Sequence, residues 1–529
     1  MTALLIANAL IADGSGSEPF PGSVAVQGDR IELVLPAGEP EPPAERRVDA
    51  GGRVLGPGFI DVHSHSDLTP FIEPGMDSML RQGVTALVVG NCGGSAFPAV
   101  GIPDAAALAG VDASTLDLGW NTFAEYLALV DERHPALNVA ALVGHGTLRE
   151  DALGRERRAA TDDELAAMRH RLAEALDDGA VGMSSGLVYA PGMHASTEEL
   201  ADVAGELGRR GGVYASHIRG EGPSVFEAVA ECVEIGRRAG CPSHVSHLKV
   251  ETHPMWGRAG DLLELIDAER ERDADVSADQ YPYAAWETNL DSALPPWTAP
   301  TELPPLLADP NERTRLFEAI ERGEPGWQSS VDGVGWDRIV IGAYHGPIEA
   351  SGRTVAAIAE ELGVEPVEAA CRLLVDDPTT SMVGHAMDED DVRAILARPD
   401  VFVSTDALAV APDGPLGPFH VHPRYYGSYP RVLGRYVRDE KVLPLGTAIA
   451  KMTSGPAERF GLAGRGRIEP GAFADLVLFD PETVADRATY ERPHVFAAGI
   501  DLVVVNGRIA WRDGRPGERA GRALRRGER

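Results

Sequence analysis

The sequence predicts an α/β protein: a TIM-type (β/α)8 barrel, a small β-sandwich domain formed by both chain termini, and an inserted subdomain between strands seven and eight. Three observations predict it. Short alternating apolar runs fill both ends of the chain, eight apolar strand candidates alternate with helical segments in the middle, and one connection is far too long for a single helix. Eight βα units in chain order favour a closed parallel barrel over an open sheet.

The two ends of the chain have the pattern of short antiparallel strands. Residues 1–57 hold alternating runs split by Gly, Pro and Asp, and residues 464–529 share this texture, with a strong hairpin signal at Asn506-Gly507. Two β-rich ends around one long middle predict a single small domain built from both. The last 19 residues carry seven arginines and three acidic residues, and we expect them to be a solvated, frayed tail.

Residues 58–463 carry the strand candidates of the barrel. Ser196 and Ser224 each precede a Glu by three residues, which is typical of a capping box at a helix start. The spacing from His217 to His247 is about one βα unit of roughly 30 residues. The eight candidates are FIDVHSH, ALVVGNC, AALVGHG, AVGMSSG, GVYASHI, SHVSHLK, DVSADQY and VFVSTD.

One connection breaks this rhythm. The stretch from Asp279, at the end of strand seven, to Asp406, at the end of strand eight, is several times too long for one βα unit. Part of it, near residues 288–340, is rich in Pro and Trp. We therefore expect an inserted subdomain at approximately 288–340.

Composition excludes several classes of function. The net charge of −33 argues against nucleic acid or an anionic membrane surface as a partner. The sequence has no run of about 18 apolar residues and no basic leader, so neither a membrane span nor a signal peptide is expected. Four cysteines are too few for a disulfide framework, which indicates a reducing, cytoplasmic location. The sequence leaves the oligomeric state open.

Polar side chains gather at the carboxyl ends of the strand candidates, where parallel barrels place their active sites. His63, His65 and Asp67 alternate after the first strand and so share one face. A single histidine is more often a satisfied core residue, but imidazoles, a thiol and a carboxylate together suit Zn²⁺. The remaining strand ends contribute Cys92, His145, Ser184, His217, His247, Asp279 and Asp406.

The same residues lie in motifs that resemble a known family. GPGFIDVHSHSD, GNCGGSAFP, YASHIRGE and SHLK are similar to the amidohydrolase superfamily. The strand-two cysteine and the run HPRYYGSYPRVLGRYVRD (422–439) more specifically resemble the N-acyl-D-amino-acid deacylases, or D-aminoacylases. The resemblance covers nearly the whole chain. It implies zinc-dependent hydrolysis of the amide bond of N-acyl-D-amino acids, which gives a free D-amino acid and a carboxylate.

The resemblance also implies a metal centre. It assigns a tightly held zinc to Cys92, His217 and His247, and a second, weaker metal position to His63 and His65. Asp406 matches a metal-binding catalytic carboxylate, which would take a proton from the attacking water and later pass it to the departing amine.

Substrate-binding residues follow from the resemblance and from charge. Lys249 and Arg424 match groups that hold the substrate α-carboxylate, helped by Tyr283, with Tyr281 as the alternative. Lys249 is one of only three lysines in the chain, which favours a positioned ammonium over a solvated charge. Arg219 is expected to be an additional cation at the pocket. Two further side chains are expected to line it, Ser185 and Tyr189.

Other members of the superfamily are the nearest alternatives. A cyclic-amide hydrolase of the hydantoinase or dihydroorotase type would use a carboxylated lysine on strand four, yet that strand ends in MSSG. A dipeptidase or a deaminase of the same superfamily is a further alternative. A metal-free scaffolding protein on the same barrel is a different class, and the retention of every candidate ligand argues against it.

Three positions carry separate expectations. Ala407 follows the catalytic Asp where the family usually has Gly, and we expect it to reshape the pocket. His244 lies an odd number of residues from His247, which predicts that it faces outward, toward the helices. His145 matches no ligand and is expected to pack or to support the site. The preferred side chain and acyl length are not decided by the sequence.

Overall fold

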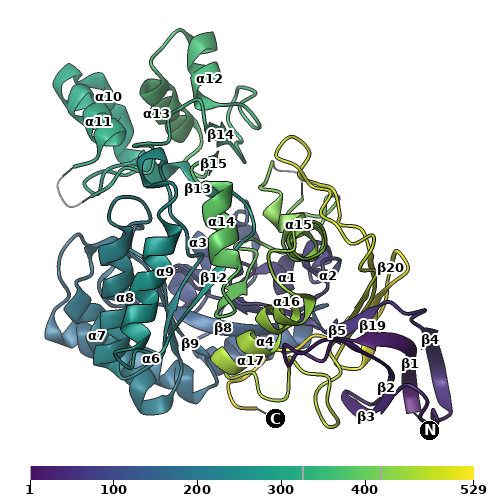
Figure 1. Ribbon diagram of the computed structural model, residues 1–529. Coiled ribbons are helices and arrows are strands. Elements are labelled where there is room, and N and C mark those ends of the chain that lie inside the picture. The colour runs from purple at the N-terminus through teal and green to yellow at the C-terminus, as the bar shows by residue number, and fades with distance from the viewer. Residues whose placement is uncertain (1, 325–326, 418–419, 529) are drawn as a thin grey trace.

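The computed structural model describes residues 2–324, 327–417 and 420–528, and Figure 1 shows its three parts: a barrel, a mixed sheet and an insertion. Purple strands from the N-terminus and yellow strands from the C-terminus meet in the sheet, and the teal and green insertion projects from the other side of the barrel. The predicted barrel and the joint sheet of the two termini are confirmed.

The barrel consists of eight parallel strands in chain order, which confirms all eight strand candidates. Its first and last strands meet through a parallel bridge between Ser64 and Ala407, and the His65 N–H donates to the Ala407 carbonyl at 3.0 Å. The strands are β6 (Phe59–Asp61), β7 (Val84–Val89), β8 (Asn138–Gly144), β9 (Gly182–Gly186), β10 (Val213–His217), β11 (Ser243–Val245), β12 (Val276–Gln280) and β16 (Val401–Val403).

The helices of the barrel start only partly as expected. The Ser196 hydroxyl accepts the Glu199 N–H at 3.2 Å and caps one helix, whereas Ser224 makes no cap and instead lies 3.4 Å from Gln328 Oε1. The helices before strand eight are α1 (Thr69–Ile72), α2 (Asp77–Leu80), α3 (Ile102–Leu108), α4 (Phe123–Arg133), α5 (His145–Leu153), α6 (Asp162–Asp177), α7 (Thr197–Arg210), α8 (Val225–Ala239), α9 (Ala259–Arg270) and α14 (Glu389–Leu396). After it come α15 (Arg424–Arg431), the π-helical η7 (Val432–Asp439), α16 (Leu445–Met452) and α17 (Ser454–Arg459).

Both chain termini contribute to one nine-stranded mixed sheet, in which β5 pairs with β17 and so joins the two ends of the chain. We predicted a small β-sandwich for this domain. In the structure, hydrogen bonds join all nine strands into one continuous sheet. Alternate residues point to opposite faces: Leu476 lies in the domain's own core, and Val477 packs into the core of the barrel. The strands are β1 (Thr2–Ile11), β2 (Phe20–Gln27), β3 (Arg30–Pro36), β4 (Ala44–Asp49), β5 (Val54–Pro57), β17 (Leu476–Phe479), β18 (Ile500–Val505), β19 (Arg508–Arg512) and β20 (Arg515–Pro516).

The insertion between β12 and β16 has its own hydrophobic core and a three-stranded antiparallel sheet in the order β13-β15-β14. The expected range of 288–340 covers only part of it, because β15 pairs with both other strands and two helices follow residue 340. Its elements are β13 (Trp286–Asn289), α10 (Leu303–Ala308), α11 (Pro310–Arg322), β14 (Ile339–Ile341), α12 (Val355–Leu362), α13 (Pro366–Asp376) and β15 (Ser381–Gly384).

The C-terminal tail is packed, not frayed as expected. The Leu524 N–H donates to the Val139 carbonyl at 2.7 Å, and the Val139 N–H donates to the Arg522 carbonyl at 2.9 Å. Ala523 and Leu524 are buried, and Leu524 joins the apolar cluster inside the barrel. Because Val139 lies at the amino end of β8, the tail closes the end of the barrel opposite the strand carboxyl ends.

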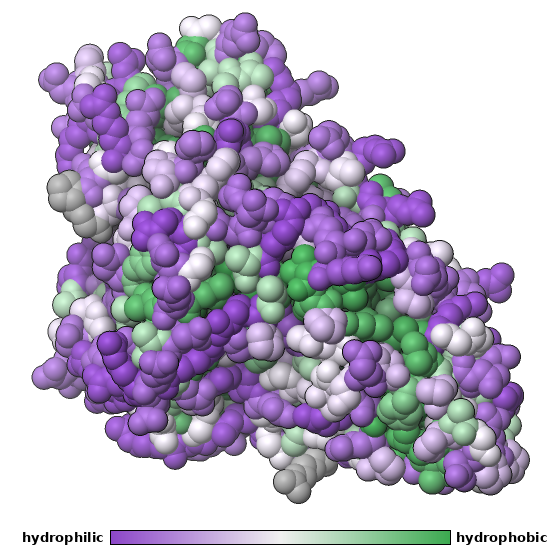
Figure 2. Space-filling model, viewed as in Figure 1, coloured by the Kyte–Doolittle hydropathy of each residue, from purple (hydrophilic) through white to green (hydrophobic). Residues whose placement is uncertain are grey.

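The face of the molecule in view is mostly polar. Figure 2 shows hydrophilic side chains over most of the face in view, interrupted by smaller apolar areas. Within the part of the chain that the structure describes, no helix is both long enough and apolar enough to cross a membrane.

Candidate active site

A cavity of about 580 Å³ opens at the carboxyl ends of the barrel strands. Cys92, His217, His247 and Asp406 line it, each from the segment that follows or ends a different strand. The insertion supplies part of its wall, including Trp286–Asn289 of β13. The convergence predicted from the strand ends is therefore present, and the insertion covers one side of it.

The backbone leaves regular strand geometry at three of these residues. Cys92, His247 and Asp406 have φ values of 52°, 37° and 50°, in a region that residues other than glycine seldom adopt. The loop after β7 also lies close to β9, since a Cβ added at Gly93 would sit 2.5 Å from the Gly186 nitrogen. Such conformations cost about 1–3 kcal/mol each and cluster at functional sites.

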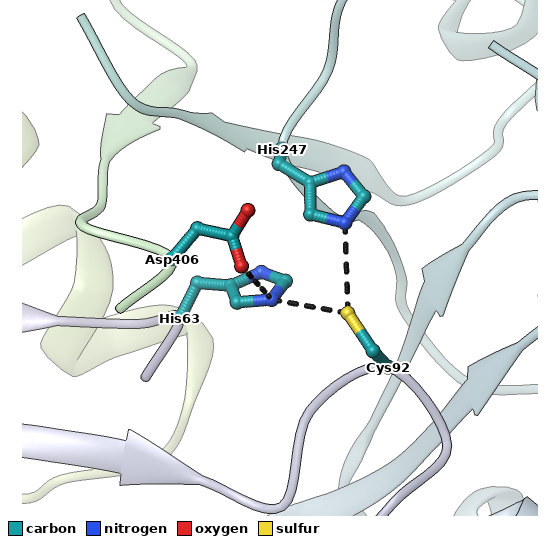
Figure 3. A group of neighbouring side chains, drawn as sticks. All are labelled: His63, Cys92, His247 and Asp406. Atoms are coloured by element: carbon teal, nitrogen blue, oxygen red, sulfur yellow. Dashed lines mark hydrogen bonds and ion pairs between the residues drawn. The ribbon is translucent and has the colours of Figure 1, made fainter. Parts of the chain in front are cut away.

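Four side chains meet at the centre of the site (Figure 3). The Cys92 Sγ lies 3.2 Å from His63 Nε2 and 3.5 Å from His247 Nε2. Asp406 Oδ1 lies 3.4 Å from the same His63 nitrogen. All four donor atoms fall within 4.8 Å of one another.

The other two predicted ligands border this group. His65 Nε2 lies 3.1 Å from Asp406 Oδ1, and His217 Nδ1 lies 2.9 Å from His247 Nε2. The structure thus brings together all six residues that the resemblance assigned to metal: Cys92, His217, His247, His63, His65 and Asp406.

The geometry fits a zinc ion. Donors at about 2.0–2.3 Å from a tetrahedral zinc lie roughly 3.3–3.8 Å apart, close to the separations from Cys92 to His63 and His247. One thiolate with several imidazoles is also the donor set that zinc prefers. Cys92, His63, His247 and Asp406 could hold one ion, and His217 and His65 extend the donor set on either side.

The electrostatics favour the ligating forms of Cys92 and Asp406. Burial raises the pKa of the Cys92 thiol, but the charges of His63 and His247 outweigh it and hold this pKa well below its ordinary value. For the Asp406 carboxyl, burial is likewise outweighed by Arg424 and His63, so its pKa also lies well below the usual range. A thiolate and a carboxylate are the forms that bind metal.

Glu221 is a site residue that the sequence analysis did not identify. Its carboxylate lies 2.9 Å from His247 Nδ1 and accepts a hydrogen bond from Lys249 Nζ at 2.6 Å. Because His247 Nε2 faces Cys92, Glu221 meets the other ring nitrogen and fixes the orientation of the imidazole. The only sequence signal was its position, four residues after His217.

His63 has a comparable partner in Asp279. Asp279 Oδ2 lies 3.5 Å from His63 Nδ1 and 2.8 Å from His244 Nε2, and Oδ1 accepts from the Ser404 hydroxyl at 2.6 Å. His244 therefore points into the barrel, and the prediction that it faces outward is wrong. The alternation that predicted it ends where the backbone at His247 turns out of strand geometry.

The two predicted carboxylate-binding cations both lie in the cavity wall. Arg424 Nη1 donates to Asp406 Oδ2 at 2.8 Å, and Lys249 Nζ lies 2.8 Å from His247 Nδ1. Of the two tyrosines, Tyr281 lines the cavity. The Arg424 guanidinium carbon lies over the Tyr281 ring, 4.8 Å from the ring centroid. Tyr283 is outside the lining, and its hydroxyl donates to the Pro423 carbonyl at 3.5 Å.

The remaining predicted pocket residues differ in their placement. Tyr189 lines the cavity, with its ring edge against His217 and its hydroxyl 3.0 Å from Thr288 Oγ1 of the insertion. Arg219 also lines it, but its guanidinium is held by Glu231 at 3.0 Å. Ser185 is buried outside the lining, and its hydroxyl lies 2.7 Å from the Tyr214 hydroxyl.

Two expectations about neighbouring positions have clear outcomes. The Ala407 side chain packs in the core and does not line the cavity, so it does not reshape the pocket directly. Its backbone instead closes the barrel through Ser64 and His65. His145 is buried beside Glu199, with Nε2 3.3 Å from Oε1, and this contact links α5 to α7.

Comparisons with known proteins agree with this geometry. The model of the Amidohydrolase family matches residues 46–288 and 316–510. Three curated proteins of Alcaligenes xylosoxydans xylosoxydans align over 99% of this chain and 95–97% of their own length: an N-acyl-D-glutamate deacylase (39% identical), a D-aminoacylase (38%) and an N-acyl-D-aspartate deacylase (36%).

Solved structures show the same relationship. The N-acyl-D-glutamate deacylase of Bordetella bronchiseptica, in complex with zinc and a phosphonate mimic of the tetrahedral intermediate, is 36% identical, with a TM-score of 0.83 and 99% of each chain covered. A D-aminoacylase with a binuclear metal centre, activated by one metal and attenuated by the second, is 35% identical, with a TM-score of 0.84 over 99% of this chain and all of its own. A D-hydantoinase shares only the fold, at 15% identity, a TM-score of 0.55 and 99% coverage of both chains. The chain thus belongs to the amidohydrolase family and, within it, to the D-aminoacylases.

Proposed function

We propose that this protein is a zinc-dependent hydrolase that releases the acyl group of N-acyl-D-amino acids. The observation that carries the proposal is the meeting of Cys92, His63, His247 and Asp406 within 4.8 Å, at the base of a cavity that also holds Arg424 and Lys249. Zinc bound among these donors would polarise the scissile carbonyl and make water nucleophilic near neutral pH.

We assign the proton transfers of this reaction to Asp406. Its carboxylate faces His63 and His65 on one oxygen and Arg424 on the other. As general base it takes a proton from the attacking water, and as general acid it returns that proton to the departing amine. Since a substrate carboxylate would compete for Arg424, binding would weaken the hold of this guanidinium on Asp406 and raise its basicity.

Arg424 and Lys249 provide the binding end of the site. Both side chains are buried, and an anionic group reaching them is shielded from water. The planar guanidinium of Arg424 suits a carboxylate geometrically, and its contact with Tyr281 fixes its plane. Arg424 contacts Asp406 at 2.8 Å and Lys249 contacts His247 at 2.8 Å, so an α-carboxylate held by these cations would bring the neighbouring amide to the metal ligands.

The cyclic-amide alternative has less support. β9, the fourth barrel strand, runs from Gly182 to Gly186 without a lysine, and the chain has lysines only at 249, 441 and 451. A carboxylated lysine therefore cannot bridge two metals from that strand. The likeness to hydantoinases indicates the fold alone.

The test is a rate comparison across matched N-acetyl-D- and N-acetyl-L-amino acids, with zinc-loaded protein. We expect the D-enantiomers to be hydrolysed faster by at least about tenfold. Chelator-treated protein is the control, and its activity should return when zinc is restored. Preference for L-enantiomers, or hydrolysis of a cyclic amide in place of both, would contradict the proposal.

A further inference from the structure

Acidic side chains outnumber basic ones in the cavity wall. Among the described residues, eight carboxylates but only five lysine or arginine side chains line it. None of the four internal residues outside the described ranges is basic. The carboxylates are Asp67, Asp104, Glu150, Glu221, Glu251, Glu287, Asp291 and Asp406, and the basic side chains are Arg155, Arg157, Arg219, Lys249 and Arg424.

Every one of the five basic side chains already has a carboxylate partner. Two of these partners, Glu231 and Glu302, lie outside the lining, so they neutralise cavity cations without reducing the number of cavity acids. The pairs and their N–O distances are Lys249–Glu221 (2.6 Å), Arg424–Asp406 (2.8 Å), Arg157–Glu302 (2.9 Å), Arg219–Glu231 (3.0 Å) and Arg155–Glu150 (3.0 Å).

The histidines outside the metal cluster do not alter this balance. His345 Nδ1 lies 3.0 Å from Asp377 Oδ2 and is thus already beside an acid. Burial lowers the pKa of His194 and of His420, so both imidazoles are neutral in mildly alkaline solution. They cannot offer a charge to a substrate.

Four cavity acids, in contrast, lack a basic partner within 4.0 Å in the described chain: Asp67, Glu251, Glu287 and Asp291. Glu287 is the best placed of them. Its carboxylate accepts the His422 N–H at 3.4 Å, and its backbone carbonyl accepts from Arg424 Nη2 at 3.3 Å. Burial raises its pKa to about 7, so it is largely ionised at pH 8.5. It adds negative charge next to the carboxylate-binding cation.

We propose that this cavity selects N-acyl-D-amino acids with an uncharged side chain and rejects a second carboxylate on the substrate. The inference rests on the proposed function, in which Lys249 and Arg424 are taken up by the α-carboxylate. A side-chain carboxylate then finds no unmatched cation and meets Glu287 or Asp291 instead. Zinc held in the site would not act as an unmatched cation, because the Cys92 thiolate and the Asp406 carboxylate would balance its two positive charges. The chain thereby differs from its relatives named for D-glutamate and D-aspartate.

The experiment compares kcat/KM for N-acetyl-D-glutamine and N-acetyl-D-glutamate at pH 8.5 with zinc-loaded protein. The two substrates have nearly the same shape and differ in charge. We expect glutamine to be favoured by at least about tenfold. Equal rates, or a preference for glutamate, would overturn the inference while leaving the proposed function intact. Failure to hydrolyse any N-acetyl-D-amino acid would instead contradict the proposed function.

A variant makes the test specific. Glu287→Gln removes one unmatched charge and keeps the hydrogen-bond acceptor, and we expect it to reduce the glutamine-to-glutamate ratio several-fold. Glu264→Gln, at an exposed position on α9, makes the same change in net charge outside the cavity and should leave the ratio unchanged. Asp291→Asn is a second cavity variant, should the first fold poorly. A ratio unchanged in both cavity variants would overturn the role of these carboxylates.

Discussion

The two ends of the barrel differ sharply in chemistry. At the closed end, apolar side chains fill the interior, and Phe460, Leu462 and Leu524 cover it from the C-terminal part of the chain. At the open end, thiol, imidazole, carboxylate and guanidinium groups converge, and the backbone is strained at Cys92, His247 and Asp406. The comparison teaches that apolar packing at the closed end stabilises the fold. That stability offsets the cost of holding polar groups and strained backbone in fixed positions at the open end.

A column of polar contacts connects the two ends. The His244 ring lies among apolar groups of the interior, with ring centroids 5.9 Å from Phe402 and 5.3 Å from Phe460. It contacts Asp279, which in turn contacts His63 at the metal cluster. The Asp279 carboxyl is buried, but His63 and His244 more than offset that burial and hold its pKa well below the usual range. The position of His63 thus depends on residues deep in the barrel.

The largest effect should follow from a change at the open end. Asp406→Ala removes the group that moves the proton, and we expect kcat to fall by about 10³-fold. Zinc measured by atomic absorption should remain bound, because Cys92, His217 and His247 keep their donors. Turnover close to that of the unaltered protein would contradict the role of Asp406.

An intermediate effect is expected where the two ends meet. Asp279→Asn keeps the shape of the side chain but weakens the orientation of His63, so zinc affinity should fall about 10–100-fold, and kcat/KM with it. A competitive chelator titration measures the affinity separately from activity. The matched control is Ser404→Ala, which removes one donor to Asp279 but leaves its charge, and it should have a smaller effect. Equal zinc affinity in Asp279→Asn and the unaltered protein would show that His63 is positioned without it.

The smallest effect on catalysis should follow from a change at the closed end. Leu524→Ala removes a buried side chain and should lower the free energy of unfolding by about 2–3 kcal/mol. The kcat/KM of the folded protein should be unchanged. Chemical denaturation measures the first quantity and steady-state kinetics the second. Leu33→Ala, at a position 39% exposed, is the control and should cost much less stability. A loss of activity without a loss of stability would contradict the separation of the two ends.

The sequence predicted the barrel because its strands carry a local signal. Each buried run ends in a polar residue type, and parallel strands in chain order leave few alternative topologies. The candidate ligands Cys92, His217 and His247 follow from the same strand ends, and the structure brings them together. Their roles in catalysis remain predictions.

The remaining differences depend on information that is not local. His244 faces inward because the backbone at His247 departs from strand geometry, which alternation cannot show. The tail was expected to be solvated because its arginines dominate the composition. Ala523 and Leu524 are nevertheless buried, and the Arg526 N–H donates to the Gly179 carbonyl at 3.0 Å. The insertion extends past residue 340 because β15 completes a sheet with strands distant in sequence.

X-ray absorption spectroscopy at the zinc edge tests the central claim most directly. The metal centre predicts one sulfur scatterer at about 2.3 Å from zinc together with nitrogen and oxygen ligands at about 2.0–2.2 Å. The sulfur contribution should vanish in Cys92→Ala. A purified protein whose zinc has only nitrogen and oxygen ligands, or one that binds no zinc with all ligands intact, would contradict the account.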